Sequence, residues 1–240
     1  PGRRVAGEAE FDLPDLATFR EIGAMEVLQP KAPVVLLRNF REDPEAHPLP
    51  TPSGKIELFS DAIAEFGYDD TPGHPVWAEP YEWLGAPLAE TYPLHLISNQ
   101  PKTRLHSQLD SGGISRGSKI QDREPMTMNP SDAAARGIEN GDVVRLYNDR
   151  GACLAGVIIS DAVRPGVVQL STGAWYDPEE PGVVGSLCKH GNPNVLTRDI
   201  GTSRIGQGPS AQSVLVEVEK YVGTPPPVTS FVPPEILERD

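Results

Sequence analysis

The sequence has few cysteines, few aromatic residues and no long apolar run. Cys153 and Cys188 are the only cysteines among 240 residues, and they do not form a Cys-x-x-Cys pair. This spacing argues against a zinc or iron–sulfur site made by the chain, while a disulfide and two reduced thiols both remain open. No apolar run has the length needed to span a bilayer, and no signal peptide is visible.

Net positive charge is also missing. The formal net charge is -13, which opposes binding to nucleic acid or to anionic lipid, so neither is expected as a partner. A small anionic ligand remains possible, because local N–H groups and a few arginines can override the overall field. The 26 prolines and 23 glycines predict many turns and extended segments.

The first part of the chain, residues 1–90, is predicted to be an extended, proline-rich arm. A weak helical period spans residues 15–28, interrupted by Gly23, and the apolar runs 34–37 and 56–59 predict short strands. Residues 61–66 predict a short helix that ends at Gly67. The aromatic side chains of this arm either dock on a larger body or pack on the chain's own barrel, and both interpretations remain open. They are Trp77, Tyr81 and Trp83.

From residue 91 to 222 the pattern becomes that of a compact β domain. Short alternating segments at 94–98, 143–147, 153–160, 167–170 and 214–218 predict strands of a closed barrel. One short helix is predicted at 129–137, with Asn129 as its cap, Pro130 in its first turn and Gly137 as its stop. The sequence Asn-Asp-Arg-Gly at 148–151 predicts a tight hairpin turn. Residues 223–240, rich in proline, are predicted to form an extended tail.

An ordered set of segments resembles the molybdopterin-dinucleotide-binding domain of the dimethyl-sulfoxide reductase superfamily. The set covers nearly the whole chain, and its members are individually weak but collectively specific. Within the superfamily, Arg-Leu-His-Ser-Gln and Gly-Ala-Trp-Tyr-Asp-Pro point to the dimethyl-sulfoxide, trimethylamine-N-oxide and biotin-sulfoxide reductases. The segments begin at Thr51 (TPSGKIELFS), Leu94 (LHLISNQP), Arg104 (RLHSQL), Asn129 (NPSDAAARGI), Gly141 (GDVVR), Gly173 (GAWYDP) and Gly191 (GNPNVLTRDIGTS).

The resemblance implies a mainly β fold, a six-stranded double-psi β-barrel. It also implies that a bacterial parent enzyme holds molybdenum on two molybdopterin guanine dinucleotides (Mo-bis-MGD), with the metal's side-chain ligand outside this chain. We therefore expect the chain, which starts Pro-Gly-Arg-Arg without Met, to be the C-terminal part of a longer reductase, inactive alone and partnered by the remaining domains. Whether the parent is cytoplasmic or periplasmic, and which oxide it reduces, stays open.

A pterin is a flat ring edged with hydrogen-bond donors and acceptors, so amide, imidazole and hydroxyl side chains on loops suit it. Arg104, His106, Ser107 and Gln108 supply four such groups within five residues, and the resemblance favours His106, Ser107 and Gln108 as cofactor contacts. Arg104 could face a phosphate of the dinucleotide. The alternative is that Arg104 and His106 only satisfy nearby backbone carbonyls.

Three further loops supply candidate cofactor contacts. Ser98 and Gln100 follow a predicted strand, Asn192 and Asn194 flank a proline, and Gln207 lies between two glycines. Each loop also has a purely structural alternative. Ser98 and Gln100 could form an ordinary capped strand end, Asn192 and Asn194 a structural turn, and Gln207 a surface loop. No catalytic residue is expected in the chain, because oxygen-atom removal belongs to the metal and its dithiolenes.

Trp175 and Tyr176 are expected to fill the barrel rim or an interface with missing domains. Cys153 is expected to be a small core residue, and Cys188 is not expected to be catalytic. Two other functions remain open. One is a non-enzymatic double-psi barrel that recognises proteins, which scattered rather than converging candidate residues would favour. The other is a free-standing small subunit of a separate catalytic chain.

Overall fold

The computed structural model describes residues 14–26, 33–233 and 236. The chain divides into two units, Pro1–Ser60 and Asp61–Asp240. The boundaries expected from the sequence at residues 90 and 222 both lie inside the second unit. They stay predictions.

In the first unit, the predicted helix is confirmed as α1, Leu16–Ile22. Asp15 caps it by accepting a hydrogen bond of 2.8 Å from the Thr18 N–H, and Gly23 ends it at a φ of 72°. Residues 27 and 28, the end of the helical period, lie outside the described residues. A second short helix, α2, spans Arg38–Glu42.

The prediction of two strands in this unit is wrong. Residues 34–37 form an irregular segment and a turn, in which Leu37 takes a left-handed φ of 57° and Val34 is 96% exposed. Residues 56–59 are also irregular, and Leu58 is exposed. A strand needs a neighbouring strand for its backbone groups, and the described residues of this unit contain no strand. Apolar alternation alone could not reveal this.

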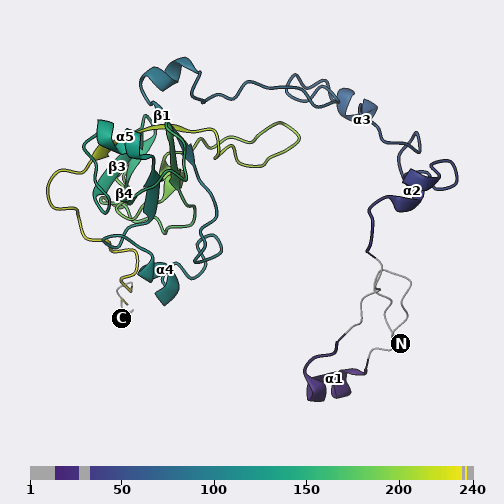
Figure 1. The fold of residues 1–240 in the computed structure, drawn as a ribbon, viewed down its shortest axis with the longest axis horizontal. Helices are drawn as coiled ribbons and strands as arrows, with labels where there is room; N and C mark the ends of the chain where they lie inside the picture. Colours follow the sequence, from purple (N-terminus) through teal and green to yellow (C-terminus); the bar gives the residue numbers. More distant parts are fainter. Residues whose placement is uncertain (1–13, 27–32, 234–235, 237–240) are drawn as a thin grey trace, which may run out of the picture. The chain divides into compact units, whose positions relative to one another are not determined.

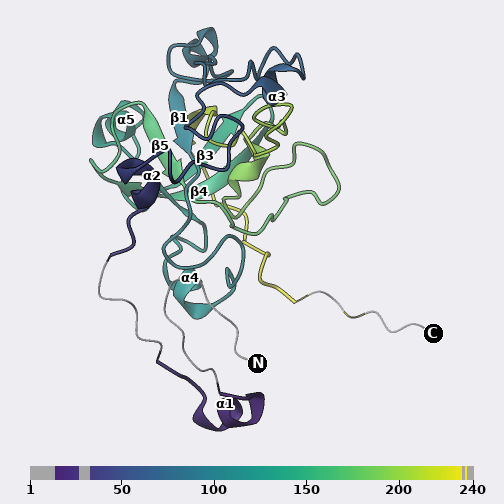
Figure 2. The same ribbon diagram turned by 90° about the vertical axis from the view of Figure 1, so that its right-hand side faces the viewer.

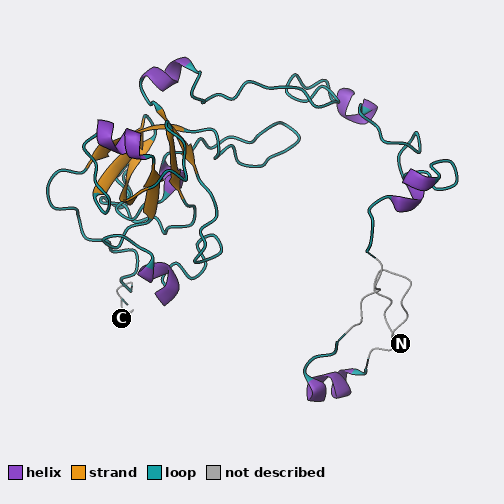
Figure 3. Ribbon diagram, in the orientation of Figure 1, coloured by secondary structure: helices purple, strands orange, loops and turns teal. Residues whose placement is uncertain are grey.

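The second unit contains a closed barrel with short helices around it (Figures 1 and 3). The predicted helix at 61–66 is confirmed as α3, Asp61–Ala64, and Gly67 follows it with a φ of 62°. The other elements are η1 Pro87–Glu90, β1 Leu94–Ile97, α4 Gly113–Gly117, β2 Pro125–Met128, α5 Pro130–Ala135, β3 Val143–Asn148, β4 Gly151–Ile159, β5 Val167–Leu170, η2 Pro193–Val195 and β6 Leu215–Lys220.

The barrel closes in the strand order β1-β5-β2-β4-β3-β6, with β6 returning to β1. Two pairs are parallel, β1 with β5 and β2 with β4, and the other four are antiparallel. The helices α4 and α5 lie toward opposite ends of this barrel (Figures 1 and 2). The predicted fold class, mainly β with a six-stranded double-psi barrel, is confirmed. Strand β2 was not predicted, because Pro125 and two methionines are weak strand signals.

Alternating strand residues fill the barrel. Leu94 and Leu96 of β1 pack with Met126 and Met128 of β2 in one buried apolar cluster. Cys153 belongs to this cluster, so its predicted place in the core is confirmed, and Cys188 also lies there as a free thiol. Burial raises the pKa of the Cys153 thiol well above its usual value, and the neighbouring Cys188 adds to this effect.

The predicted ends of helix α5 and the predicted hairpin turn at 148–151 are confirmed. Asn129 caps α5 by accepting from the Ser131 N–H at 3.0 Å, and Gly137 takes a φ of 61° after the helix. β3 and β4 pair from Val143 opposite Gly156 to Asn148 opposite Gly151, so only Asp149 and Arg150 form the hairpin turn. Among the described residues, no helix is both long and apolar enough to cross a membrane.

Candidate functional site

Two adjoining hollows at one part of the barrel collect six of the nine candidate residues. The first, here the glutamine hollow, has a volume of about 620 Å³, and its lining includes Ser98, Gln100, His106 and Asn194. The second, the tryptophan hollow, has about 420 Å³, and its lining includes His106, Ser107, Trp175, Asn192 and Asn194. The two share His106, Thr172 and Asn194. Loops that are far apart in the sequence therefore converge on one polar wall.

His106 is held in an unusual backbone conformation at this wall. Its φ is 49°, in the left-handed region that few non-glycine residues adopt. Gln100 fixes it from two sides, because the Gln100 side-chain oxygen accepts from the His106 N–H at 3.1 Å and the Gln100 amide nitrogen lies 2.9 Å from the ring Nδ1. Such local strain persists only where the surroundings enforce it, and it concentrates at functional sites.

Gly173 makes the close approach to His106 possible. A Cβ at position 173 would lie 1.9 Å from the His106 carbonyl oxygen, and Gly173 has a φ of 92°. Only glycine meets both conditions. The segment after β5 can therefore lie directly against the loop that carries His106.

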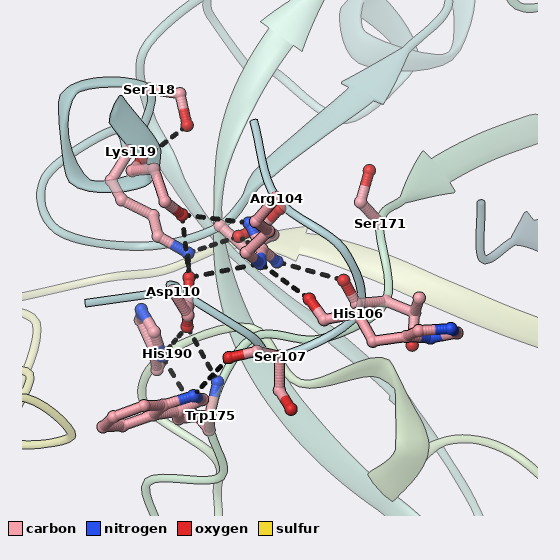
Figure 4. A network of polar contacts seen from close by, with 12 residues as sticks. Arg104, His106, Ser107, Asp110, Ser118, Lys119, Ser171, Trp175 and His190 are labelled. Atoms are coloured by element: carbon pink, nitrogen blue, oxygen red, sulfur yellow. Dashed lines mark hydrogen bonds and ion pairs between the residues drawn. The ribbon is translucent and has the colours of Figure 1, made fainter. Parts of the chain in front are cut away.

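Arg104 is inside the protein rather than in either hollow. Its side chain is 0% exposed and forms ion pairs with Asp110 at 3.4 Å and Glu124 at 3.1 Å. It also donates to the carbonyl oxygens of His106 at 3.1 Å and Thr172 at 3.0 Å (Figure 4). The expected phosphate contact is thus not available to this guanidinium as it is placed. Arg104 instead joins the two segments that form the shared wall.

Lys119 completes a buried ion cluster, defined here as Arg104, Asp110, Lys119 and Glu124. Its ammonium group lies 2.7 Å from Asp110 and also contacts Glu124 (Figure 4). Two cations and two carboxylates leave the cluster neutral, which is the condition under which buried charges are tolerated. Burial alone would raise the pKa of Asp110, but hydrogen bonds from Lys119 and from the Trp175 N–H, with the charges of Lys119 and Arg104, hold it below its ordinary value.

Trp175 forms one side of the tryptophan hollow. Its indole N–H donates to the Ser107 carbonyl at 2.9 Å, and its backbone N–H donates to Asp110 at 3.0 Å (Figure 4). Asp110 therefore ties the Trp175 segment to the loop 104–110. The expected place of Trp175 at the barrel rim is compatible with this, but its indole also faces candidate cofactor residues.

Asn192 and Asn194 lie at the start of η2 and have different roles in the wall. The Asn192 side chain accepts from the Asn194 N–H at 2.9 Å and so caps the short helix. The Asn194 side-chain amide forms no hydrogen bond with any described residue, although the residue lines both hollows. Asn194 therefore offers a free donor and acceptor to a ligand.

Two candidate residues lie elsewhere. Gln108 is exposed and lines neither hollow. Gln207 lines a third hollow of about 570 Å³, and its amide donates to the Ser203 carbonyl at 2.8 Å, which closes its own loop. Arg198 borders both this hollow and the glutamine hollow. Gln207 thus matches the surface-loop alternative more closely than the converging wall.

Sequence reasoning missed several residues that build the site. Asp110, Lys119 and Glu124 hold the wall from behind, and nothing in their local sequence marks them. Gln212 was also missed; its amide donates to the Ser98 carbonyl at 2.6 Å and its oxygen accepts from the Ser98 N–H at 3.2 Å. Gln212 lies 114 positions from Ser98 and Glu124 lies 20 positions from Arg104, so only the fold brings these two pairs together.

The comparison with known families decides what kind of domain this is. The model of the molydopterin dinucleotide binding domain matches residues 94–215, which include the whole barrel up to the start of β6 and the shared wall. The chain belongs to this family.

Several relatives of this molydopterin dinucleotide-binding domain are reductases. Trimethylamine-N-oxide reductase 1 of Escherichia coli K12 is 54% identical over 192 residues, which are 79% of this chain and 23% of that protein. Dimethyl sulfoxide/trimethylamine N-oxide reductase of Rhodobacter capsulatus is 51% identical over 207 residues, 86% of this chain and 25% of that protein. The chain thus spans about a quarter of the length of these relatives.

A solved structure shares the fold. Acetylene hydratase from Pelobacter acetylenicus superposes with a TM-score of 0.60 at 23% identity, over 75% of this chain and 25% of that chain. The wall of this molydopterin dinucleotide-binding domain suits a pterin edge, since an imidazole, hydroxyls and a free amide face the hollows. No group of three or more His, Cys, Asp or Glu residues able to hold a metal occurs among the described residues.

Proposed function

We propose that this chain binds one molybdopterin guanine dinucleotide of a Mo-bis-MGD cofactor, within a longer reductase that acts on S-oxides or N-oxides. The observation that carries the proposal is the shared wall, where His106, Thr172 and Asn194 border both hollows. Convergence of separate polar loops on one wall is what a flat ligand with a hydrogen-bonding edge requires.

Each residue of the wall would have a distinct role. The Asn194 amide and the Ser107 hydroxyl would bond the pterin edge, and His106 would present its ring from a fixed backbone position. Gln100 and Arg104 would act as positioning residues, because both bind groups of the His106 residue itself. Bound molybdenum and its dithiolenes would supply the two-electron chemistry of oxygen-atom removal.

The reductase activity and the substrate class are proposed from the relatives' names and the family resemblance, and the remaining domains as partners from the quarter of the relatives' length that the chain spans. Biotin sulfoxide remains one of the predicted substrates, beside dimethyl sulfoxide and trimethylamine N-oxide. The metal's side-chain ligand and the second pterin site would be contributed by other parts of the parent. This chain would bind, orient and bury one molybdopterin guanine dinucleotide.

A titration of the 240-residue chain with 6-carboxypterin, followed by ¹H–¹⁵N NMR, tests the proposal. Weak binding that shifts the signals of His106, Ser107 and Asn194 is expected, with a dissociation constant in the order of 1 mM, since other walls are missing. Asn194→Ala should weaken it, whereas Gln108→Ala, in the same polar loop as His106 but outside both hollows, should leave it unchanged.

A different result would contradict the proposal. Tight binding of ATP or NAD by calorimetry would indicate another ligand class. Shifts confined to surfaces away from the shared wall would show that the hollows do not recognise a pterin.

A further inference from the structure

The C-terminal segment 226–231 is bound to the barrel by its own set of partly buried contacts. Asp177 accepts three hydrogen bonds from it: the Thr229 N–H at 2.6 Å, the Thr229 hydroxyl at 2.6 Å and the Ser230 N–H at 3.1 Å. Lys189 donates to the same hydroxyl at 2.9 Å, and Arg123 donates to the Pro226 carbonyl. A segment expected to be a simple extended tail is therefore fixed at several points.

Phe231 packs its ring against Trp175, which lines the tryptophan hollow. Its centroid is 5.7 Å from the Trp175 ring and 4.9 Å from the His190 ring, which it meets edge to face. The Arg116 guanidinium lies over the Phe231 ring at 5.4 Å. Aromatic pairs at such distances stabilise a structure beyond the burial of their surface, so Phe231 supports the Trp175 ring.

His190 connects the same segment to the backbone of Trp175. It is fully buried, and its Nδ1 lies 3.0 Å from the Trp175 carbonyl oxygen, so Nδ1 carries the proton and donates. Burial lowers the pKa of His190, and the charge of Lys119 lowers it further, which favours the neutral ring. Trp175 is thus held through its backbone carbonyl by His190, through its N–H by Asp110 and through its indole by Ser107.

We propose that residues 226–231 form a C-terminal clasp that fixes the Trp175 side of the tryptophan hollow against a bound pterin, with Phe231 and Asp177 as positioning residues. The inference rests on the proposed function. The clasp lies outside residues 94–215 that match the family, so it adds a structural part to the site that the barrel alone does not contain. A clasp of this kind increases affinity by ordering the wall before the ligand arrives.

The test compares four versions of the 240-residue chain by two measurements. The versions are the unchanged chain, Phe231→Ala, the conservative Phe231→Tyr, and Val232→Ala, in which the adjacent side chain is 65% exposed. The measurements are hydrogen exchange of the Trp175 indole N–H, resolved in ¹H–¹⁵N spectra, and the dissociation constant for 6-carboxypterin. Circular dichroism melting gives the global stability of each version.

The clasp predicts faster exchange of the Trp175 indole and a dissociation constant raised about fivefold in Phe231→Ala. The melting temperature should change little, Phe231→Tyr should restore both readouts, and Val232→Ala should resemble the unchanged chain. Equal exchange and equal affinity in Phe231→Ala and the unchanged chain would overturn the inference. So would a loss of affinity that Phe231→Tyr does not restore.

A second variant covers the case in which Phe231→Ala does not fold. Thr229→Val removes only the hydroxyl that Asp177 and Lys189 bind. Like Phe231→Ala, it should raise the dissociation constant for 6-carboxypterin. An unchanged constant in Thr229→Val would count against the clasp. If the unchanged chain fails to bind 6-carboxypterin while the indole exchange still responds to Phe231→Ala, the proposed function fails and the ordering of Trp175 by the clasp stands.

Discussion

Gln100 fixes both the backbone and the ring of His106. Because the His106 N–H can only donate, the atom of Gln100 at 3.1 Å from it must be the oxygen, and the atom facing the ring must be the NH₂ group. That group lies 2.9 Å from Nδ1 and 3.5 Å from Nε2, so the shorter contact favours Nδ1 as the acceptor and Nε2 as the nitrogen that carries the proton. The hydrogen-bond pattern thus favours one tautomer of a ring that borders both hollows.

Gln100→Glu should reverse this tautomer. A carboxylate can accept from the His106 N–H with one oxygen, but its other oxygen can only accept from the ring, which favours a proton on Nδ1. Two-bond ¹H–¹⁵N correlations of the imidazole distinguish the two forms. Persistence of the Nε2–H form in Gln100→Glu would refute the assignment, and Gln108→Glu is the matched control, because Gln108 lines neither hollow.

Gly173→Ala should disrupt the wall. The new Cβ would lie 1.9 Å from the His106 carbonyl oxygen, so either the loop 104–110 or the segment after β5 must move. We expect a loss of about 3 kcal/mol or more in the free energy of unfolding. Gly182→Ala is the control, because Gly182 has a similar φ of 83° with nothing within 4 Å of its Cβ, so only backbone strain of about 1 kcal/mol applies. Equal losses in urea unfolding would show that the close approach does not matter.

Acid should weaken the fold through Asp110. Its pKa in the folded protein is lower than in the unfolded chain, where aspartate titrates near about 3.9. The ion cluster therefore contributes fully above that value, and its contribution is lost as the pH falls through the folded pKa. Unfolding free energies measured from neutral pH down to about pH 2 should fall at the acid end for this reason.

Asp110→Asn should remove part of this acid dependence and destabilise the protein at neutral pH by about 3 kcal/mol, because it leaves two buried cations with the single carboxylate of Glu124. Asp149→Asn, on the exposed hairpin turn, should change neither property. A pH profile of Asp110→Asn that matches the unchanged chain would assign the acid sensitivity to another group. Asp177 is the next candidate: burial alone would raise its pKa, but hydrogen bonds from Thr229 and Lys189, with the charge of Lys189, lower it.

Glu82 should anchor the segment before the barrel more strongly than its aromatic neighbours do. The carboxylate is buried, pairs with Arg150 at 2.8 and 3.0 Å and accepts from the Leu215 N–H at 2.8 Å. Glu82→Ala leaves both donors unsatisfied and should cost about 3 kcal/mol. Trp77, in contrast, is 82% exposed, so Trp77→Ala should have little effect on the folding of this chain. Urea unfolding compares the two, and equal effects would contradict the role of Glu82.

The sequence predicted the barrel because strand alternation and turn residues are local signals. Asn129, Gly137 and the hairpin at 148–151 behave as their residue types dictate. The strands predicted at 34–37 and 56–59 failed because strand formation depends on a partner that local alternation does not reveal.

In the candidate site, too, features set by local sequence could be predicted, and features that depend on distant partners could not. Polar residues on loops, such as His106 and Asn194, could be proposed from the sequence, and the fold brings them to one wall, where their role in binding stays a prediction. The burial of Arg104 could not be foreseen, because Glu124 and Thr172 reach it only through barrel closure. Trp175 was expected at the rim, but its bond to Ser107 joins segments 68 positions apart.

The closed barrel also limits how this domain can meet another protein. Every one of its six strands already has a hydrogen-bonded neighbour on each side, so the barrel presents no unpaired edge. A peptide cannot extend this sheet as an additional strand. Whatever docks on the domain must therefore use its loops or the outward-facing side chains of its strands, and such docking can change through mutations there while the strand pairing stays the same.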